Sequence, residues 1–215
     1  MDDVLMAAYE IDEKPIGFWG MLRLLVLKPR TFFKQTVARD QFPNLAFAAW
    51  LVGLAHALQW MDKILLTQGG LISNRFSSFA LVIVSSFLFM LIFILIGGVL
   101  LHFYAYLADS RKDMKNSVAV TVYAWMPFVI GVFLTKIIAI IFLGSNYLNP
   151  PEGWWFQMPS MAIIGLTVLY GWFLGVYGAI RGLGCKKFRA VIMLFTVPIL
   201  WFVFMFLLFR NLGWM

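Results

Sequence analysis

The chain has 215 residues, of which 62% are hydrophobic and 13% are charged, and its mean hydropathy is +0.87. An ordinary soluble domain is about half apolar and a quarter charged, so this composition excludes a water-soluble globular protein and indicates an integral membrane protein. The net charge of +7 lies in short basic runs between apolar segments, a placement that sets membrane topology and does not indicate a nucleic-acid partner.

The first forty residues come before any segment long enough to span a bilayer. Residues 1–15 form an acidic leader without the small-residue cleavage site of a secretory signal peptide. Residues 16–40 repeat apolar side chains every three or four positions with basic residues between them, and Pro29 suits the first turn of a second short helix. This pattern predicts amphipathic helices that lie in the inner-leaflet interface, against anionic lipid headgroups, or pack on the cytoplasmic ends of the spans, and the two placements are compatible.

Residues 41–215 are predicted to form an all-α, polytopic domain of five transmembrane helices. A span needs about 20 mostly apolar residues, and five segments meet this need. The first segment is the weakest because it is short and contains His56 and Gln59, whereas the second is long enough to tilt. The five segments are residues 44–61, 79–107, 118–143, 161–180 and 190–209.

The distribution of Lys and Arg predicts how these helices are oriented. Thirteen of these residues lie before the first span and in the loops after the second and fourth spans, whereas three lie on the opposite side. The positive-inside rule then places the N-terminus in the cytoplasm and the C-terminus outside. We therefore expect residues 144–160 to form an outer loop, with Trp154 and Trp155 at the headgroup level. The single cysteine, Cys185, allows no intramolecular disulfide.

Four glycines of the fourth span, at spacings of four, three and four, share one face of the predicted helix. Such a face lets two helix backbones approach closely, which is the main packing device in lipid. We expect it to make a contact inside the bundle, with a dimer interface as the alternative. The four residues are Gly171, Gly175, Gly178 and Gly182.

The third span contains a proline and a lysine within apolar sequence. Pro127 removes a hydrogen bond from a helix, so we expect a kink that releases the carbonyl of Tyr123, with a moving hinge as the alternative. Lys136 lies near the outer boundary, and its side chain tilts toward the membrane interior, which opposes snorkelling. We therefore hypothesise an ion pair from Lys136 to Asp62 or Glu152, with the free carbonyls at the helix C-terminus as the alternative partners.

The sequence offers no set of residues that would support catalysis. None of the five segments contains Asp or Glu, which proton-coupled pumps and aspartyl intramembrane proteases generally need. His56 and His102 are far apart and make a weak metal site, and neither a P-loop nor a dinucleotide-binding fingerprint occurs. We therefore expect no enzyme activity, no cofactor and no bound metal.

Three stretches, in their order along the chain, resemble the bacterial branch of the Yip (Ypt/Rab-interacting) family of membrane proteins, whose shared region is the Yip-one domain. The resemblance covers the chain from about residue 20 to the end. The acidic element of the eukaryotic branch has no clear match, so Rab binding is not expected. The stretches are "LVLKPRTFF" at 25–33, "VAVTVYAWMPFVIGVF" at 118–133 and "YGWFLGVYGAIRGLGCKKFRAVIMLFTVP" at 170–198.

The resemblance implies a five-helix membrane fold and a non-enzymatic role in membrane organisation or protein assembly. We therefore expect a scaffold or adaptor in the bacterial cytoplasmic membrane that binds a protein partner or a second copy, with the anionic inner leaflet as its lipid partner. The alternative is a small permease or channel, or a lipid-handling protein, in which Pro127, Lys136 and the pair Gly97 and Gly98 line a path that is broken in mid-membrane.

Overall fold

The structure is a computed structural model that describes residues 17–67, 75–110, 112–143 and 154–196. These described residues form helices and turns and contain no strand. The chain begins with two short helices, α2 (Phe18–Leu27) and α3 (Pro29–Gln35), and a 3-10 turn, η2 (Val37–Arg39). The helices that follow are α4 (Leu45–Thr67), α5 (Arg75–Ile92), α6 (Gly98–Leu107), α7 (Met114–Ala124), α8 (Met126–Leu143), α9 (Trp154–Arg181) and α10 (Lys187–Val191).

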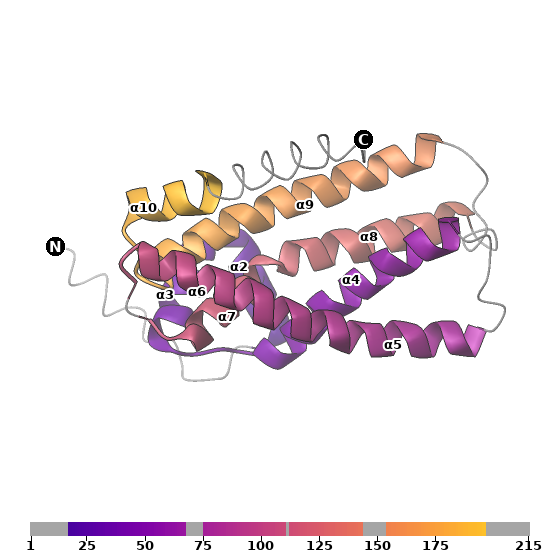
Figure 1. Ribbon diagram of the computed structural model, residues 1–215. Coiled ribbons are helices and arrows are strands. Elements are labelled where there is room, and N and C mark those ends of the chain that lie inside the picture. The colour runs from indigo at the N-terminus through magenta and orange to yellow at the C-terminus, as the bar shows by residue number, and fades with distance from the viewer. Residues whose placement is uncertain (1–16, 68–74, 111, 144–153, 197–215) are drawn as a thin grey trace, which may run out of the picture.

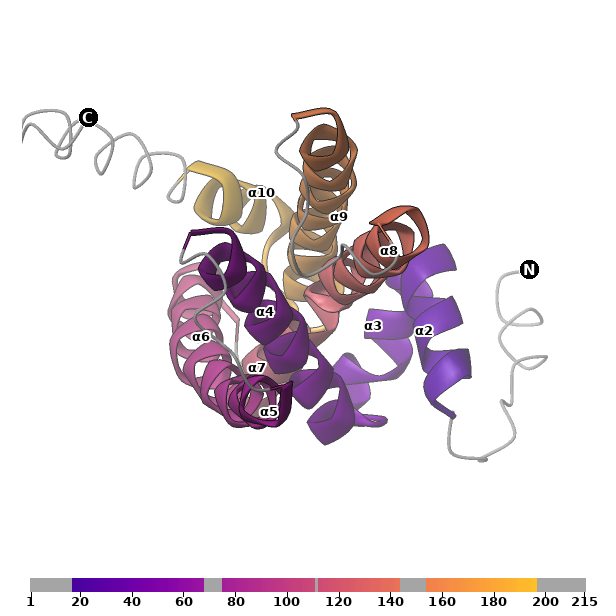
Figure 2. The ribbon, with the colours of Figure 1, turned by 90° about the vertical axis from the view of Figure 1, so that its right-hand side faces the viewer.

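The long helices run roughly along one direction, and α2 crosses that direction at the edge of the bundle (Figures 1 and 2). α5 and α6 form one helical stretch through a π-helical turn, Phe93–Gly97. α4 packs along α5 and α8, and α8 packs along α9. The connections from α6 to α7 and from α9 to α10 lie at the same end of the bundle as α3 (Figure 1).

Three helical stretches in the described part of the chain are long and apolar enough to cross a membrane, namely Ala80–Leu107, Met114–Phe142 and Ser160–Arg181. They correspond to the second, third and fourth predicted spans. The first predicted span falls in α4, where Leu45–Trp60 forms a shorter apolar helix. Most of the fifth predicted span lies outside the described residues, so the number of five spans stays a prediction.

The fourth predicted span begins earlier than expected. α9 starts at Trp154, so Trp154 and Trp155 are helical, and the prediction that they lie in an outer loop was wrong. Pro159 is the sixth residue of α9. A proline at that position lacks the N–H that would bond to the Trp155 carbonyl, so the second turn of α9 has one hydrogen bond fewer.

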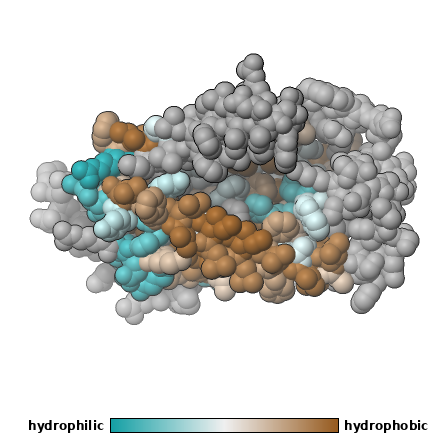
Figure 3. All heavy atoms as spheres, viewed as in Figure 1, coloured by the Kyte–Doolittle hydropathy of each residue, from teal (hydrophilic) through white to brown (hydrophobic). Residues whose placement is uncertain are grey.

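Large apolar side chains cover the outward faces of the long helices, as the brown band in Figure 3 shows for the face in view. A contiguous exposed apolar surface of this kind marks a contact with a partner or with lipid, and around helices of spanning length it fits acyl chains. The residues that are more than half exposed include Val84, Leu88, Leu95, Ile96, Ile141 and Leu166.

α7 is the most enclosed helix of the described chain. Every residue from Asn116 to Ala124 is buried except Val118, which is half-buried. Neighbouring segments surround it, with α6, α9 and α4 in contact along its length. Its hydroxyl groups have hydrogen-bond partners, since Thr121 Oγ1 donates to the Ser117 carbonyl at 2.9 Å and the Ser117 hydroxyl lies 3.3 Å from Nδ1 of His102. α7 can therefore be buried although its sequence is only weakly apolar.

α2 and α3 pack on the end of the bundle near α7, which is the second of the two placements predicted for residues 16–40. Their inward side chains Met21, Leu25, Phe32 and Phe33 are fully buried. The ring of Phe32 meets the ring of Tyr123 edge-on, with centroids 5.0 Å apart. Burial of each such side chain contributes about 1.5–3 kcal/mol, so these four residues hold the two short helices in place.

The first half of the glycine face of α9 packs against the end of α7. A Cβ built on Gly171 would lie 2.6 Å from the carbonyl oxygen of Ala124, which is too close for a side chain. A Cβ built on Gly175 would lie 3.8 Å from the Cβ of Ala124, which is an ordinary contact. Gly171 is therefore the position at which the backbones of α7 and α9 need a missing side chain to approach each other.

The second half of the face packs against α7, α3 and η2. A Cβ on Gly178 would collide with the Val120 side chain and would lie 3.1 Å from Cε1 of Phe33. A Cβ on Gly182 would lie 3.1 Å from the Cβ of Val37. The glycine face is thus used inside this chain, as expected, and each of its levels receives a different neighbour.

The third span is interrupted next to Pro127. α7 ends at Ala124, α8 begins at Met126, and Trp125 between them has φ −89° and ψ −2°. Pro127 is the second residue of α8, where few of the backbone N–H groups have a partner within the helix, so its missing N–H costs little. Helical hydrogen bonds continue on both sides of this residue, since the Trp125 N–H donates to the Thr121 carbonyl at 3.3 Å and the Val129 N–H donates to the Trp125 carbonyl at 3.3 Å. Pro127 therefore lies at a local break within one helical stretch, Met114–Phe142, next to the position where we expected a kink.

We predict that Gly171→Ala destabilises the folded protein by about 1–3 kcal/mol, because the new methyl group meets a backbone carbonyl that cannot move aside. Thermal unfolding in mild detergent would measure this. Gly165→Ala is the matched control, because Gly165 is on the same helix and a Cβ there would meet nothing within 4 Å. Equal midpoints for the two variants would contradict the close approach.

Candidate functional site

Positive charge is concentrated at one end of the bundle, which we call the basic end. It comprises α2, α3, and the connections from α6 to α7 and from α9 to α10. The described residues place eleven Lys and Arg side chains there against three Asp, an excess of eight positive charges. Figure 3 shows hydrophilic residues gathered at this end. The basic residues are Arg23, Lys28, Arg30, Lys34, Arg39, Lys112, Lys115, Arg181, Lys186, Lys187 and Arg189, and the acidic residues are Asp40, Asp109 and Asp113.

Asp40 fastens η2 to the beginning of α7. The Asn116 side chain, which is fully buried, donates hydrogen bonds to the Val37 carbonyl at 2.9 Å and to the Asp40 carboxylate. The Lys112 ammonium donates to the Ala38 carbonyl at 3.0 Å and lies 3.4 Å from the Asp40 carboxylate. The backbone of Asp40 has φ 58°, a left-handed conformation that Asp tolerates better than most residues. These contacts join segments that are more than seventy residues apart in the chain.

Asp109 fastens the α6–α7 connection to the α9–α10 connection. Its carboxylate lies 2.7 Å from the Lys186 ammonium and 2.7 Å from the Arg189 guanidinium. Next to it, Ser110 Oγ donates to the Leu183 carbonyl at 2.8 Å. Exposed ion pairs contribute little singly, but together with this hydrogen bond they fix how the two connections face each other.

The pKa of both carboxyl groups is lowered from the ordinary Asp value. For Asp40 the main cause is the hydrogen bond from Asn116, followed by the positive charge of Lys112, while partial desolvation acts in the opposite direction. For Asp109 the main cause is the hydrogen bond from Lys186, supported by the charges of Arg189 and Lys186 against partial desolvation. Both groups are therefore carboxylates at neutral pH, which is the form that fastens the basic end.

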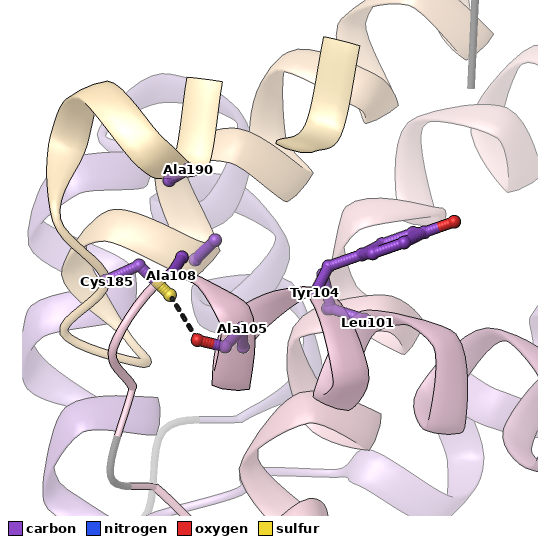
Figure 4. A pocket seen from close by; sticks show the side chains of 7 residues that line it. Leu101, Tyr104, Ala105, Ala108, Cys185 and Ala190 are labelled. Atoms are coloured by element: carbon purple, nitrogen blue, oxygen red, sulfur yellow. Dashed lines mark hydrogen bonds between the residues drawn. The ribbon is translucent and has the colours of Figure 1, made fainter. Parts of the chain in front are cut away.

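Cys185 lies in the α9–α10 connection and faces a small apolar notch (Figure 4). Its thiol donates a weak hydrogen bond to the Ala105 carbonyl at 3.9 Å, and burial raises the pKa of the thiol to about 11. A thiol that stays protonated at neutral pH is a poor nucleophile, so Cys185 acts here as an apolar packing residue. The notch has no room for a water molecule, and it is lined by Leu101, Tyr104, Ala105, Ala108, Ala179, Cys185 and Ala190.

The interruption of the third span lies beside a histidine. His56 of α4 bonds through Nδ1 to the Val52 carbonyl at 2.9 Å. Its ring lies 4.7 Å from the Phe128 ring and 5.6 Å from the Trp125 ring, measured between centroids. Interrupted helices and polar side chains within apolar segments are features of transport and ion sites, so this cluster is the second candidate site.

Two tyrosine hydroxyls bind the N-terminal segment to α7 and α9. Tyr123 is fully buried, and its hydroxyl donates to the Pro43 carbonyl at 2.9 Å. Tyr170 donates to the Val26 carbonyl at 2.7 Å. Tyr123, which the sequence singled out for its freed carbonyl, therefore acts through its hydroxyl and its ring.

The ion pair predicted for Lys136 involves acidic side chains that lie outside the described part of the chain. Lys136 is half-buried on α8. Glu152 and the side chain of Asp62 are outside the described residues, so their pairing with Lys136 stays a prediction.

Among the described residues, no three His, Cys, Asp or Glu side chains are grouped as metal ligands would be. The functional residues that sequence reasoning missed are Asp40, Asp109 and Asn116. Their signal was weak, since each is a single polar residue at the border of an apolar segment, and its partner lies far away in the chain.

The described residues define a helical membrane protein with a positively charged end. A family model, the Yip1 domain, matches residues 23–209, which is most of the chain. The chain therefore belongs to the Yip1-domain family, as the three resembling stretches predicted. No curated protein and no solved structure matched the chain.

We predict that Tyr123→Phe lowers the free energy of unfolding by about 1 kcal/mol, because the Pro43 carbonyl loses a donor while the ring stays in place. Chemical or thermal unfolding in detergent would measure the loss. Tyr106→Phe is the control, since Tyr106 is 70% exposed. A loss of the same size in both variants would show that the hydroxyl of Tyr123 has no special role.

We predict that acid weakens the basic end. The pKa of Asp40 and of Asp109 is lower in the folded chain than the ordinary value of 3.8, so their stabilisation is present above that value and is lost as pH falls through and below it. The temperature at the midpoint of thermal unfolding should therefore decrease as the pH is lowered through and below 3.8. The double variant Asp40→Asn, Asp109→Asn should be less stable at neutral pH and should show a flatter profile.

The control for the acid experiment is Asp113→Asn, because Asp113 is 76% exposed and its carboxylate lies 3.9 Å from the Lys115 ammonium. Its profile should follow that of the unchanged protein. Parallel acid profiles for the unchanged protein and the double variant would refute the fastening role of the two carboxylates.

Proposed function

We propose that this chain is a non-enzymatic integral membrane scaffold or adaptor that acts in membrane organisation or in the assembly of a membrane protein complex. The observation that carries the proposal is the basic end, where an excess of eight positive charges is mounted on segments fixed by Asp40 and Asp109. A rigid charged surface attached to membrane-spanning helices suits the binding of a partner, because little order must be gained on binding. Membership in the Yip1-domain family supports the same reading.

The proposal includes five spans, a cytoplasmic N-terminus and an outer C-terminus. Support comes from the three spanning stretches, the apolar helix Leu45–Trp60 and the apolar sequence of residues 190–209. The collection of cations at one end of the bundle fits the positive-inside rule if that end is cytoplasmic. The resemblance to the bacterial branch of the family suggests the bacterial cytoplasmic membrane as the location.

A small permease, channel or lipid-handling protein is the second candidate. One observation favours it, namely the helix interruption at Trp125 beside the ring of His56. Transporters often bind solutes at interrupted helices. Among the described residues, this cluster is filled by aromatic rings, with Phe128 closest to His56.

We predict that the tagged protein, extracted from its own membranes in gentle detergent, co-purifies with a stoichiometric protein partner or forms a defined homo-oligomer. Mass spectrometry of the pull-down and the native mass of the complex would measure this. Charge reversal at Lys187 and Lys115, neither of which forms an ion pair with Asp40 or Asp109, should weaken the association without unfolding the chain.

A matched flux assay separates the two candidates. Purified protein in sealed vesicles should show no solute flux above that of empty vesicles if it is a scaffold. Flux that disappears in His56→Leu, together with a lone monomer in the pull-down, would instead favour the permease and would contradict the scaffold proposal.

A further inference from the structure

α2 has an outer face that its packing on the bundle does not explain. Met21 and Leu25 point inward and are fully buried. On the opposite side, Trp19, Arg23 and Leu27 follow one another at the four-residue spacing that aligns side chains along one helix face. Trp19 is 77% exposed and Leu27 is 68% exposed. A helix that only covered the bundle would present polar residues outward, so these two apolar side chains call for a contact of their own.

The position of α2 relates this face to the membrane boundary. At its N-terminal end, Phe18 meets Phe47 edge-on at 5.0 Å, and Phe47 lies in the first turn of α4, where the apolar segment begins. At its C-terminal end, the Val26 carbonyl accepts the hydrogen bond from Tyr170 of α9. α2 thus bridges α4 and α9 and runs across the long helices, as Figure 2 shows. A helix that crosses the spans and has one end beside the start of an apolar segment has the orientation of an interfacial helix.

The cations of α2 and α3 are available for a ligand. Arg23, Lys28, Arg30 and Lys34 are exposed. Within the described part of the chain, none of these four side chains forms an ion pair, whereas Lys112, Lys186 and Arg189 are bound to Asp40 or Asp109. The four cations are therefore exposed and without an ion pair among the described residues, on two consecutive helices that are fixed in place by their buried faces.

We infer that this surface, formed by Trp19, Arg23, Leu27, Lys28, Arg30 and Lys34, binds the headgroup region of an anionic phospholipid leaflet. The indole and the leucine side chain enter the boundary between headgroups and acyl chains, and the four cations bind lipid phosphates. Charge complementarity accounts for the cations, and an acidic protein surface would not require the exposed Trp19 and Leu27 beside them. The chain would in this way sense the anionic lipid content of its membrane.

The first test measures how deeply the face is immersed. A nitroxide label on Leu27→Cys can be attached selectively, because Cys185 is 5% exposed and its thiol has a pKa of about 11. The full chain is placed in nanodiscs of phosphatidylcholine alone or mixed with phosphatidylglycerol. We expect collisions with oxygen to increase and collisions with a water-soluble nickel chelate to decrease when phosphatidylglycerol is present. A label on Lys115→Cys, at the start of α7, is the control and should stay accessible to nickel.

The second test removes charge in matched pairs. The variant Arg23→Gln, Lys28→Gln should lose affinity for phosphatidylglycerol by about fivefold for each cation removed, since one cation near an anionic surface contributes roughly 1 kcal/mol. The variant Lys115→Gln, Lys187→Gln removes the same charge elsewhere at the basic end and should lose less. All four positions are exposed, so both variants are expected to fold, and thermal unfolding checks this.

Three results would overturn the inference. A label at position 27 that is as accessible to nickel as the label at 115 would show that the face lies in water. Equal losses in the two charge pairs would show that binding follows net charge and not this face. Shielding that occurs only in native membranes would assign the face to a protein partner. The nanodisc and charge-pair experiments use purified protein and lipid, so their outcome does not depend on whether the scaffold proposal holds.

Discussion

The close approach of α9 to α7 is the contact on which the rest of the structure depends. Gly171 lets the α9 backbone meet the Ala124 carbonyl at the point where α7 ends, so the interrupted helix is covered on that side. Further along α9, Gly178 accepts Val120 and Phe33, and Gly182 accepts Val37. One run of glycines therefore positions α7, α3 and η2 in succession. A larger side chain at these levels would push α3 outward and uncover the polar groups of α7.

This arrangement divides the bundle into two zones that are stabilised by different interactions. At the basic end, α7 lies inside a core that includes Phe32, Phe33 and Tyr123, and loss of water from apolar surface stabilises it as in a soluble protein. Along the rest of α5, α8 and α9, large apolar side chains face outward, and lipid gives no hydrophobic drive for the helices to associate. The well-packed basic end therefore fixes the angles at which the long helices leave it.

The sequence predicted those features that depend on local chemistry. Helical spacing placed the four glycines on one face, and Pro29 was placed correctly at the first position of α3. The effect of Pro127 was only half predicted, because the pattern locates a missing N–H but does not give the form of the break. Asp40, Asp109 and Asn116 were missed, since a helical period identifies the buried face of an element and not its distant partner. The two aspartates also adopt left-handed backbone conformations, which a helical period does not indicate.

The fold assigns different roles to positive charges that look alike in the sequence. Lys112, Lys186 and Arg189 are neutralised by Asp40 and Asp109, so they act as structural groups that hold distant connections together. Arg23 and Lys28 have no acidic neighbour within the described chain and lie beside exposed apolar side chains, so they keep their charge available for a ligand. The positive-inside rule counts both groups equally, because it concerns insertion and not the folded state. Burial and pairing, which appear only in the structure, separate the charges that build the basic end from those that can bind at it.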